Sequence, residues 1–272
     1  MIRRIPSLLL SVIVSVLAVT VRGNAMSAAA PCHSEEAAYN WYCKNNTDHK
    51  APALPSEFSF IEGCGGYFLD KEAREDDKVI YLTFDAGYEN GNVEKILDAL
   101  KAHNASGAFF ILSNLIKRNP ELVKRMKDEG SLVCNHTSSH KDMTKLTDEA
   151  AFSAELDKLN SEYRELTGSE LDRFYRPPEG RFCEANLKTA DKLGYKTIFW
   201  SFAYADWDNN KQPDKEKAFE KIMSHTHNGM VILLHPTSAV NAEIMDRLLT
   251  AWEKDGYRFG SLYELTKTED KR

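Results

Sequence analysis

The chain has 272 residues, of which 42% are hydrophobic and 28% charged, with a mean hydropathy of −0.47 and a formal net charge of −6. This length allows one large domain or two small ones with a sizeable buried core, and the composition excludes a disordered or collagen-like chain. The acidic balance also argues against nucleic acid as a partner, because phosphate binding relies on clustered Lys and Arg.

Residues 1–30 have the pattern of a secretory signal peptide. Arg3 and Arg4 precede an apolar run at 8–21, and small residues follow at 27–30. The apolar run has 14 residues, whereas a membrane span needs about 20, so an uncleaved membrane anchor is the weaker alternative. We therefore expect an exported protein, extracellular or in the cell wall. Its residues 31–272 carry 32 basic and 41 acidic side chains, a net charge of −9.

Export would place the cysteines in an oxidising compartment. An odd number cannot all pair within one chain, and the N-terminal segment offers one disulfide among Cys32, Cys43 and Cys64. Cys134 lies in an apolar run and is predicted to be a buried small hydrophobe. Cys183 has no neighbouring base, and no pair has Cys-x-x-Cys spacing, so a catalytic cysteine, a zinc knuckle and a thioredoxin-like site are disfavoured.

Along the chain, an N-terminal extension at 31–77, mixed and rich in turn signals, precedes one larger domain at 78–272. In that domain, short β-branched and aromatic runs alternate with longer amphipathic stretches. Strands are predicted at 79–84, 107–112, 131–134, 173–175, 196–202, 230–234 and 257–260. Helices are predicted at 93–103, 120–129, 147–166, 184–193, 214–225 and 240–255.

Seven strands alternating with six helices predict an α/β fold of βα units around a largely parallel sheet. An eight-fold barrel typically takes about 250 residues, which is more than residues 78–272 provide. The expected fold is therefore a distorted (β/α) barrel of about seven units.

Polar residues of catalytic type follow five of the predicted strands: Asp85, His136, Arg176, Asp206 and His235. In barrels built from βα units, the active site is assembled at the carboxyl ends of the strands. Five such residues on one face are difficult to attribute to chance, so we expect a catalytic site there.

His136 and His140 are four residues apart in His136-Thr-Ser-Ser-His140. On a helical turn, this spacing would place both imidazoles on one side, where they could share a metal ion. A surface pair without metal is the alternative. We expect one divalent metal, Zn²⁺ first, with Co²⁺ or Mn²⁺ as alternatives.

Two pairs are predicted among the other polar residues. Pro177 and Pro178 stiffen the chain after Arg176, which could hold that arginine against Asp85 and keep the carboxylate ionised. Asp206 offers His235 a partner that would raise its pKa. The alternatives are an Asx turn or helix cap at Asp85, a rigid turn with a surface arginine, and a core histidine.

Five segments, Thr83-Phe-Asp-Ala-Gly87, His136-Thr-Ser-Ser-His140, Arg176-Pro-Pro-Glu-Gly180, Asp206-Trp207 and Leu233-Leu-His235, together resemble the motifs of the polysaccharide deacetylase family (NodB homology domain, carbohydrate esterase family 4). Within it, the residues at 84–91 and 199–207 and those around Trp41 and Gly66 look most like the sporulation deacetylases that prepare muramic δ-lactam in spore cortex peptidoglycan. The likeness extends from about residue 41 to 265.

The resemblance implies a role for each matched residue. Asp85 matches the general base, which Arg176 positions, and His235 matches the general acid, which Asp206 tunes. His136 and His140 match the metal ligands. The pocket for the acetyl group would involve Trp207, Leu233 and the backbone N–H of Glu179, the last as oxyanion donor.

One position departs from the family. Most members have a metal-binding aspartate after the base, where this chain has Ala86; the δ-lactam subgroup itself varies there. The first hypothesis is a metal-dependent deacetylase of N-acetylmuramic acid in peptidoglycan glycan strands. The alternatives are an N-acetylglucosamine deacetylase on peptidoglycan or chitin-like chains, and a non-catalytic glycan-binding barrel. No protein partner is indicated.

Overall fold

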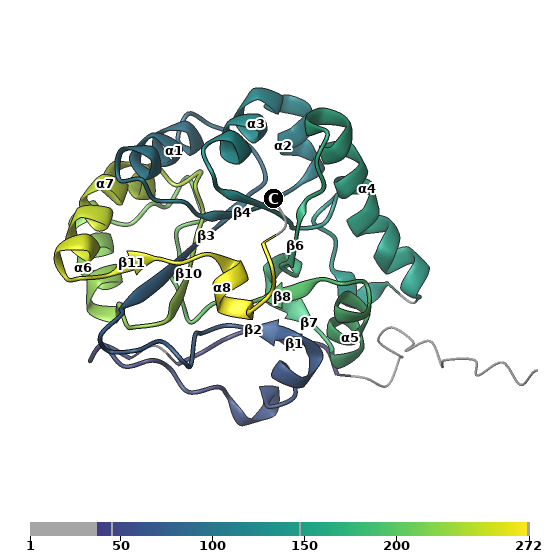
Figure 1. Ribbon diagram of the computed structural model, residues 1–272, viewed down its shortest axis with the longest axis horizontal. Coiled ribbons are helices and arrows are strands. Elements are labelled where there is room, and N and C mark those ends of the chain that lie inside the picture. The colour runs from purple at the N-terminus through teal and green to yellow at the C-terminus, as the bar shows by residue number, and fades with distance from the viewer. Residues whose placement is uncertain (1–36, 45, 147, 271–272) are drawn as a thin grey trace, which may run out of the picture.

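The computed structural model describes residues 37–44, 46–146 and 148–270, so the predicted signal peptide lies outside the described residues. Over these ranges, nine strands form one curled sheet, and the helices surround it (Figure 1). Every strand pair in this sheet is parallel. In spatial order the strands are β2 (Gly66–Tyr67), β8 (Lys196–Ile198), β6 (Asp172–Tyr175), β5 (Leu132–Asn135), β4 (Ala108–Ile111), β3 (Val79–Ala86), β10 (Met230–Leu234) and β9 (Phe202–Ala203), with β11 (Arg258–Phe259) also pairing with β3. The predicted distorted barrel is confirmed.

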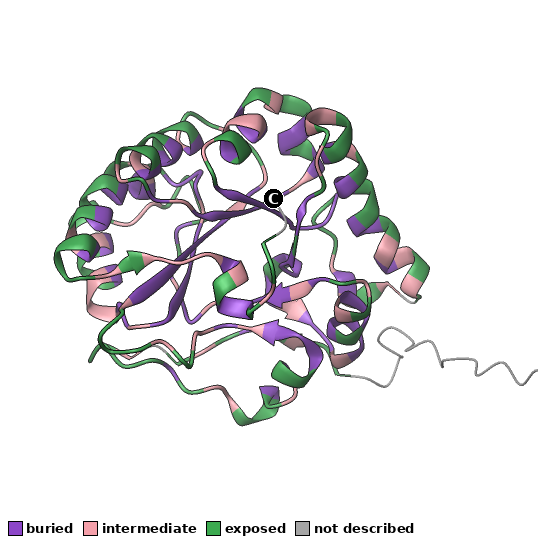
Figure 2. Cartoon of the chain, viewed as in Figure 1, coloured by how far each residue is buried: buried purple, intermediate pink, exposed green. Residues whose placement is uncertain are grey.

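Both faces of the sheet are buried (Figure 2), as expected for parallel strands covered by helices. Side chains alternate along a strand. In β3, Ile80, Leu82 and Phe84 join the core cluster between sheet and helices. Val79 and Tyr81 join the cluster inside the barrel. The apolar runs of the sequence therefore become strands because they bury both sets of side chains.

The six predicted helices form within about two residues of the expected limits: α1 (Val93–Ala102), α3 (Pro120–Asp128), α4 (Glu149–Thr167), α5 (Glu184–Lys192), α6 (Lys215–His225) and α7 (Ala239–Lys254). Side-chain caps fix several starts; Asp214, for example, accepts from the Lys217 N–H. Two short helices were not predicted, α2 (Ser113–Arg118) and α8 (Leu262–Thr266). No helix in the described part of the chain is long and apolar enough to span a membrane.

The predicted single strand at 196–202 is wrong, because residues 199–201 change neighbours. The Phe199 N–H donates to the Tyr67 carbonyl, whereas the Ser201 N–H donates to the Val231 carbonyl. The run therefore breaks into β8, which pairs with β6 and β2, and β9, which pairs with β10. Because β8 and β9 lie at opposite parts of the strand order, this segment closes the barrel.

The described part of residues 31–77 packs against the barrel. β1 (Tyr39–Asn40) pairs antiparallel with β7 (Arg181–Phe182), and β2 extends the main sheet beside β8. Cys43 and Cys64, two candidates for the predicted N-terminal disulfide, are free thiols. Cys183 is disulfide-bonded, which sequence spacing did not indicate, and Cys32, the third candidate, lies outside the described residues. Cys134 is fully buried in β5, as predicted.

Candidate active site

A cavity of about 660 Å³ opens at the carboxyl ends of the strands. Seven of the predicted site residues line it: Asp85, His136, His140, Glu179, Trp207, Leu233 and His235. Arg176 and Asp206, the other two, are almost completely buried and contact cavity residues from behind. The barrel thus brings all nine predicted side chains and backbone groups to one site.

Asp85 lies at the end of β3, and its side chain is 11% exposed. Its Oδ1 accepts a hydrogen bond of 2.9 Å from Arg176 Nη1, and its Oδ2 lies 3.6 Å from His136 Nε2. Burial by itself raises the pKa of Asp85, but its interactions with His136, Arg176 and His235, of which only the Arg176 guanidinium is permanently charged, outweigh burial and hold the pKa below the ordinary value. Asp85 is therefore an ionised carboxylate facing the cavity.

Arg176 is fully buried and has a partner for each side-chain nitrogen. Besides Asp85, its donors reach the carbonyls of Ile198 (2.9 Å) and Phe199 (3.3 Å) and the hydroxyl of Thr83 (2.9 Å). The guanidinium also lies 4.1 Å from the centroid of the Phe110 ring. These contacts fix the guanidinium, so Asp85 has a fixed orientation.

The loop after β5 brings the two histidine rings to a centroid separation of 5.0 Å. The predicted helical turn is wrong: Thr137 (φ 72°) and His140 (φ 59°) have left-handed backbone, and the segment is irregular. The His140 N–H donates to Thr137 Oγ1 at 2.9 Å, and the Thr137 N–H donates to Asn135 Oδ1 at 2.8 Å. Local side-chain bonds replace the helical ones here.

His136 has the form that metal ligation requires. Its Nδ1 makes a 2.9 Å hydrogen bond with the Arg176 carbonyl, which leaves the Nε2 lone pair toward the cavity. Burial lowers the pKa of His136 to about 4, so the imidazole is neutral. Two imidazoles beside a carboxylate fit a borderline divalent ion such as Zn²⁺.

Ala86 does not add a third protein ligand. It is completely buried and belongs to the core cluster between sheet and helices. Within the described ranges, no group of three or more His, Cys, Asp or Glu side chains is arranged to hold a metal. Any metal here would rest on His136 and His140, with its other positions open to water or substrate.

Glu155 of α4, which the sequence analysis did not single out, holds the loop at residues 136–140 in place. Its Oε2 accepts from Ser138 Oγ (2.6 Å) and Ser139 Oγ (2.9 Å), and its Oε1 accepts from Lys141 Nζ (2.6 Å). Because Ser138 and Ser139 lie between the two histidines, this carboxylate sets the loop that carries both rings. The available signal in the sequence was a Glu on the core-facing side of a predicted helix. The spacing of residues along the chain does not show which side chains this Glu contacts.

His235 follows β10 and pairs with Asp206. Its Nδ1 lies 2.7 Å from Asp206 Oδ1, and its backbone N–H donates to Asp206 Oδ2 at 2.8 Å. Asn241 Nδ2 donates to the same Oδ2 at 2.6 Å. Burial lowers the pKa of His235, but the hydrogen bond and charge of Asp206 outweigh it, so the pKa is raised overall. The imidazole at the cavity wall therefore keeps its proton to a higher pH than an ordinary histidine does.

Aromatic side chains form the rims of the cavity. Trp207 is 61% exposed, and its ring centroid lies 6.3 Å from that of His235. Tyr88 and Trp200 also line the cavity, and the Tyr88 hydroxyl accepts from Asn209. The sequence analysis did not assign Tyr88 or Trp200 to the site, although both lie within the segments 84–91 and 199–207 on which the closer resemblance rests.

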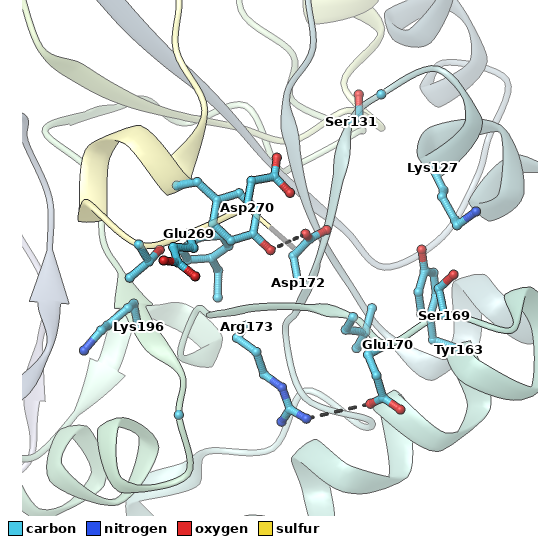
Figure 3. A pocket seen from close by; sticks show the side chains of 16 residues that line it. Lys127, Ser131, Tyr163, Ser169, Glu170, Asp172, Arg173, Lys196, Glu269 and Asp270 are labelled. Atoms are coloured by element: carbon cyan, nitrogen blue, oxygen red, sulfur yellow. Dashed lines mark hydrogen bonds and ion pairs between the residues drawn. The ribbon is translucent and has the colours of Figure 1, made fainter. Parts of the chain in front are cut away.

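A second cavity, of about 1110 Å³, lies at the opposite end of the barrel (Figure 3). Its wall includes Ser131 and Lys196, at the amino ends of β5 and β8, and Asp172, whose carboxylate accepts from the Tyr263 hydroxyl. Glu170 and Arg173 pair across its edge (Figure 3). None of the predicted site residues lines this cavity, so the larger of these two cavities is not the one that holds the predicted site.

A barrel that holds a carboxylate–arginine pair and a histidine–carboxylate pair around one cavity, at the carboxyl ends of its strands, has the form of a (β/α)-barrel enzyme. Comparison with known proteins makes this specific. Residues 72–198 match the model of the family described as "Polysaccharide deacetylase". The peptidoglycan-N-acetylmuramic acid deacetylase PdaA of Bacillus subtilis is 39% identical over 234 residues, which cover 86% of this chain and 88% of that protein.

Two further likenesses agree. A peptidoglycan-N-acetylglucosamine deacetylase of Bacillus cereus is 32% identical over 209 residues, covering 74% of this chain and 93% of that protein. The solved structure of Bacillus subtilis PdaA, a family 4 carbohydrate esterase, superposes with a TM-score of 0.80 at 40% identity, over 85% of this chain and 97% of that one. The chain belongs to the polysaccharide deacetylase family, carbohydrate esterase family 4, and is a polysaccharide deacetylase.

Proposed function

We propose that the protein removes the N-acetyl group from N-acetylmuramic acid residues of peptidoglycan. The observation that carries this proposal is the presence of two paired groups in one cavity: Asp85 is bonded to Arg176 and has a lowered pKa, and His235 is bonded to Asp206 and has a raised pKa. The 39% identity with PdaA, named an N-acetylmuramic acid deacetylase, supports the choice of sugar. A freed muramic amine can close on its own lactyl carboxylate, so we also propose a place in muramic δ-lactam formation in spore cortex.

In this mechanism, Asp85 takes the proton from the water that attacks the acetamide carbon, and Arg176 keeps the carboxylate oriented. The backbone N–H of Glu179 stabilises the oxyanion, a contact whose loss commonly costs about 3–4 kcal/mol. His235 then gives its proton to the departing amine, so acetate and a free amino sugar leave. Trp207 and Leu233 form the wall against which the acetyl group lies.

Family members are generally metal-dependent, and we propose that His136 and His140 hold one divalent ion, Zn²⁺ first and Co²⁺ or Mn²⁺ otherwise. When bound, such an ion lowers the pKa of water and polarises a carbonyl. The neutral state of His136 and its bond to the Arg176 carbonyl support this assignment. Metal analysis of the purified protein tests it, and a metal-free protein that remains fully active would contradict it.

The experiment for the activity is acetate release from peptide-stripped glycan, with and without chelator. The parent is compared with Asp85→Asn and His136→Ala; Asp208→Asn, an exposed carboxylate in the 206–212 loop, is the matched control. We expect release by the parent and by Asp208→Asn, and loss of release in the other two variants and with chelator. Equal release by all the proteins would contradict the mechanism, and glycan binding without acetate release would favour a binding role.

N-acetylglucosamine is the second candidate sugar, because the Bacillus cereus relative named for that activity matches over 93% of its length. Mass analysis of the products, with identification of the reducing ends, separates the two sugars.

We further propose that residues 1–30 direct export to the cell wall or the spore cortex region. Amino-terminal sequencing of the protein from the cell envelope tests this, and an intact terminus recovered with the membrane would favour an anchor.

A further inference from the structure

Trp41, in the predicted N-terminal extension, reaches the wall of the catalytic cavity. It follows β1, and its side chain is buried. Its backbone N–H donates to the Gly180 carbonyl at 2.8 Å, and its indole Nε1–H donates to the Trp200 carbonyl at 2.9 Å. Because Gly180 and Trp200 both line the cavity, the two hydrogen bonds of Trp41 connect two segments of the cavity wall.

The Trp41 ring is itself held firmly. It stacks on Phe199 with ring centroids 4.3 Å apart and an interplanar angle of 19°, and on Phe58 at 5.4 Å and 25°. On its amino-terminal side, the pairing of β1 with β7 fixes the backbone. A rigid aromatic group with two directed donors is suited to setting the position of its partners.

The segment that Trp41 holds has an unusual backbone. Glu179 (φ 57°) and Gly180 (φ 65°) are both left-handed, which is rare for a residue with a side chain and persists only where surrounding structure enforces it. A Cβ on Gly180 would lie 2.8 Å from the Trp200 ring and 3.1 Å from the Trp41 Cβ. Gly180 is therefore packed between the two tryptophans, which confine the turn that presents the Glu179 amide.

We propose that Trp41 is a positioning residue: it holds the left-handed turn at Glu179 and Gly180, together with Trp200, so that the Glu179 N–H faces the oxyanion. The inference rests on the proposed deacetylation. An oxyanion contact strengthens in the transition state, so its displacement lowers kcat and leaves KM nearly unchanged. Loss of a whole donor costs about 10²–10³ in kcat. We expect about a tenfold loss for Trp41→Phe, because ring stacking and the backbone bond remain.

The test combines hydrogen exchange with kinetics. Trp41→Phe removes the indole donor to Trp200 and keeps an aromatic ring. Phe60→Leu is the control, since Phe60 belongs to the same aromatic cluster and, like Trp41, contacts Phe182, but its ring has no donor for the Trp200 carbonyl. Exchange is followed by mass spectrometry in the segment 177–182, where residues 177 and 178 are prolines without an amide, so the signal comes from 179–182.

We expect faster exchange at 179–182 and lower kcat at constant KM in Trp41→Phe, with both near parent values in Phe60→Leu. Unchanged exchange in Trp41→Phe would overturn the inference whatever the activity. Losses of the same size in both variants, in proportion to a lowered melting temperature, would also overturn it, because they would reflect stability alone. A parent protein that releases no acetate would overturn the proposed function instead, and exchange would still decide whether Trp41 holds the turn.

Discussion

Asp206→Asn isolates the role of the buried carboxylate behind His235. Three donors converge on this carboxylate, His235 Nδ1 on one oxygen and the His235 N–H and Asn241 Nδ2 on the other. An amide has one oxygen and one NH₂ group. In Asp206→Asn, an NH₂ group in the position of Oδ2 would face two hydrogen-bond donors. The NH₂ group therefore takes the position of Oδ1 and faces His235 Nδ1. That nitrogen must then accept, which favours the neutral imidazole.

The magnitude follows from the bond that is lost. Hydrogen bonds to charged groups contribute about 1.5–3 kcal/mol against about 1 kcal/mol for neutral ones, so the protonated form of His235 loses about 0.5–2 kcal/mol. At alkaline pH the protonated fraction, and with it kcat/KM, should fall by about 2- to 30-fold. Because Asp206 raises the pKa of His235, its loss moves the alkaline limb of the pH profile to lower pH.

The assay is acetate release across pH, together with thermal unfolding. A raised histidine pKa stabilises the fold below the unfolded-state pKa, and this stabilisation disappears as pH rises through the folded-state value. The pH-dependent part of the stability loss in Asp206→Asn should therefore be greatest at acid pH. Asp208→Asn removes the same charge two residues away and should retain the parent profile. An alkaline limb that stays in place in Asp206→Asn would refute the role of His235 as the acid.

Three further substitutions test the remaining parts of the site. Arg176→Met leaves Asp85 buried without its partner and should lower the free energy of unfolding by about 3–5 kcal/mol, measured by denaturant titration; an unchanged midpoint would count against the pair. Glu155→Gln should weaken metal binding by about 10- to 100-fold, measured by calorimetry, with Glu165→Gln, an exposed residue of the same helix, as control. Trp207→Ala should raise KM for glycan without lowering kcat, and a kcat loss alone would show that its ring does not serve binding.

The sequence was sufficient to predict the residues that end strands. Asp85, His136 and His235 each interrupt or follow an apolar run, and parallel strands in a closed sheet bring their carboxyl ends to one edge. Element type and the principal site residues follow from this local pattern. This pattern does not depend on which strands are neighbours, so the structure brings the predicted site residues together although one predicted strand was wrong.

The remaining features depend on partners distant in sequence. The left-handed loop at Thr137 is fixed by Glu155 of α4, and helical spacing between two histidines contains no information about that carboxylate. The break between β8 and β9 arises because the Ser201 N–H donates to β10. Trp41 bonds to a residue 159 positions away. In each case a tertiary contact overrides the local pattern, and only the folded chain identifies the contact.

The surroundings of Asp85 and His235, the proposed base and acid, move their pKa values further apart than their chemistry alone would. Asp85 has a lowered pKa because the charges near it outweigh burial, and His235 has a raised pKa because Asp206 outweighs burial. Asp85 is ionised above its pKa and His235 is protonated below its own, so both shifts widen the pH range in which the two catalytic forms coexist. Both partners, Arg176 and Asp206, are buried, where salt screens them little. The proposed action of this acidic protein on an anionic wall would thus rely on charges inside its cavity, not on its net charge.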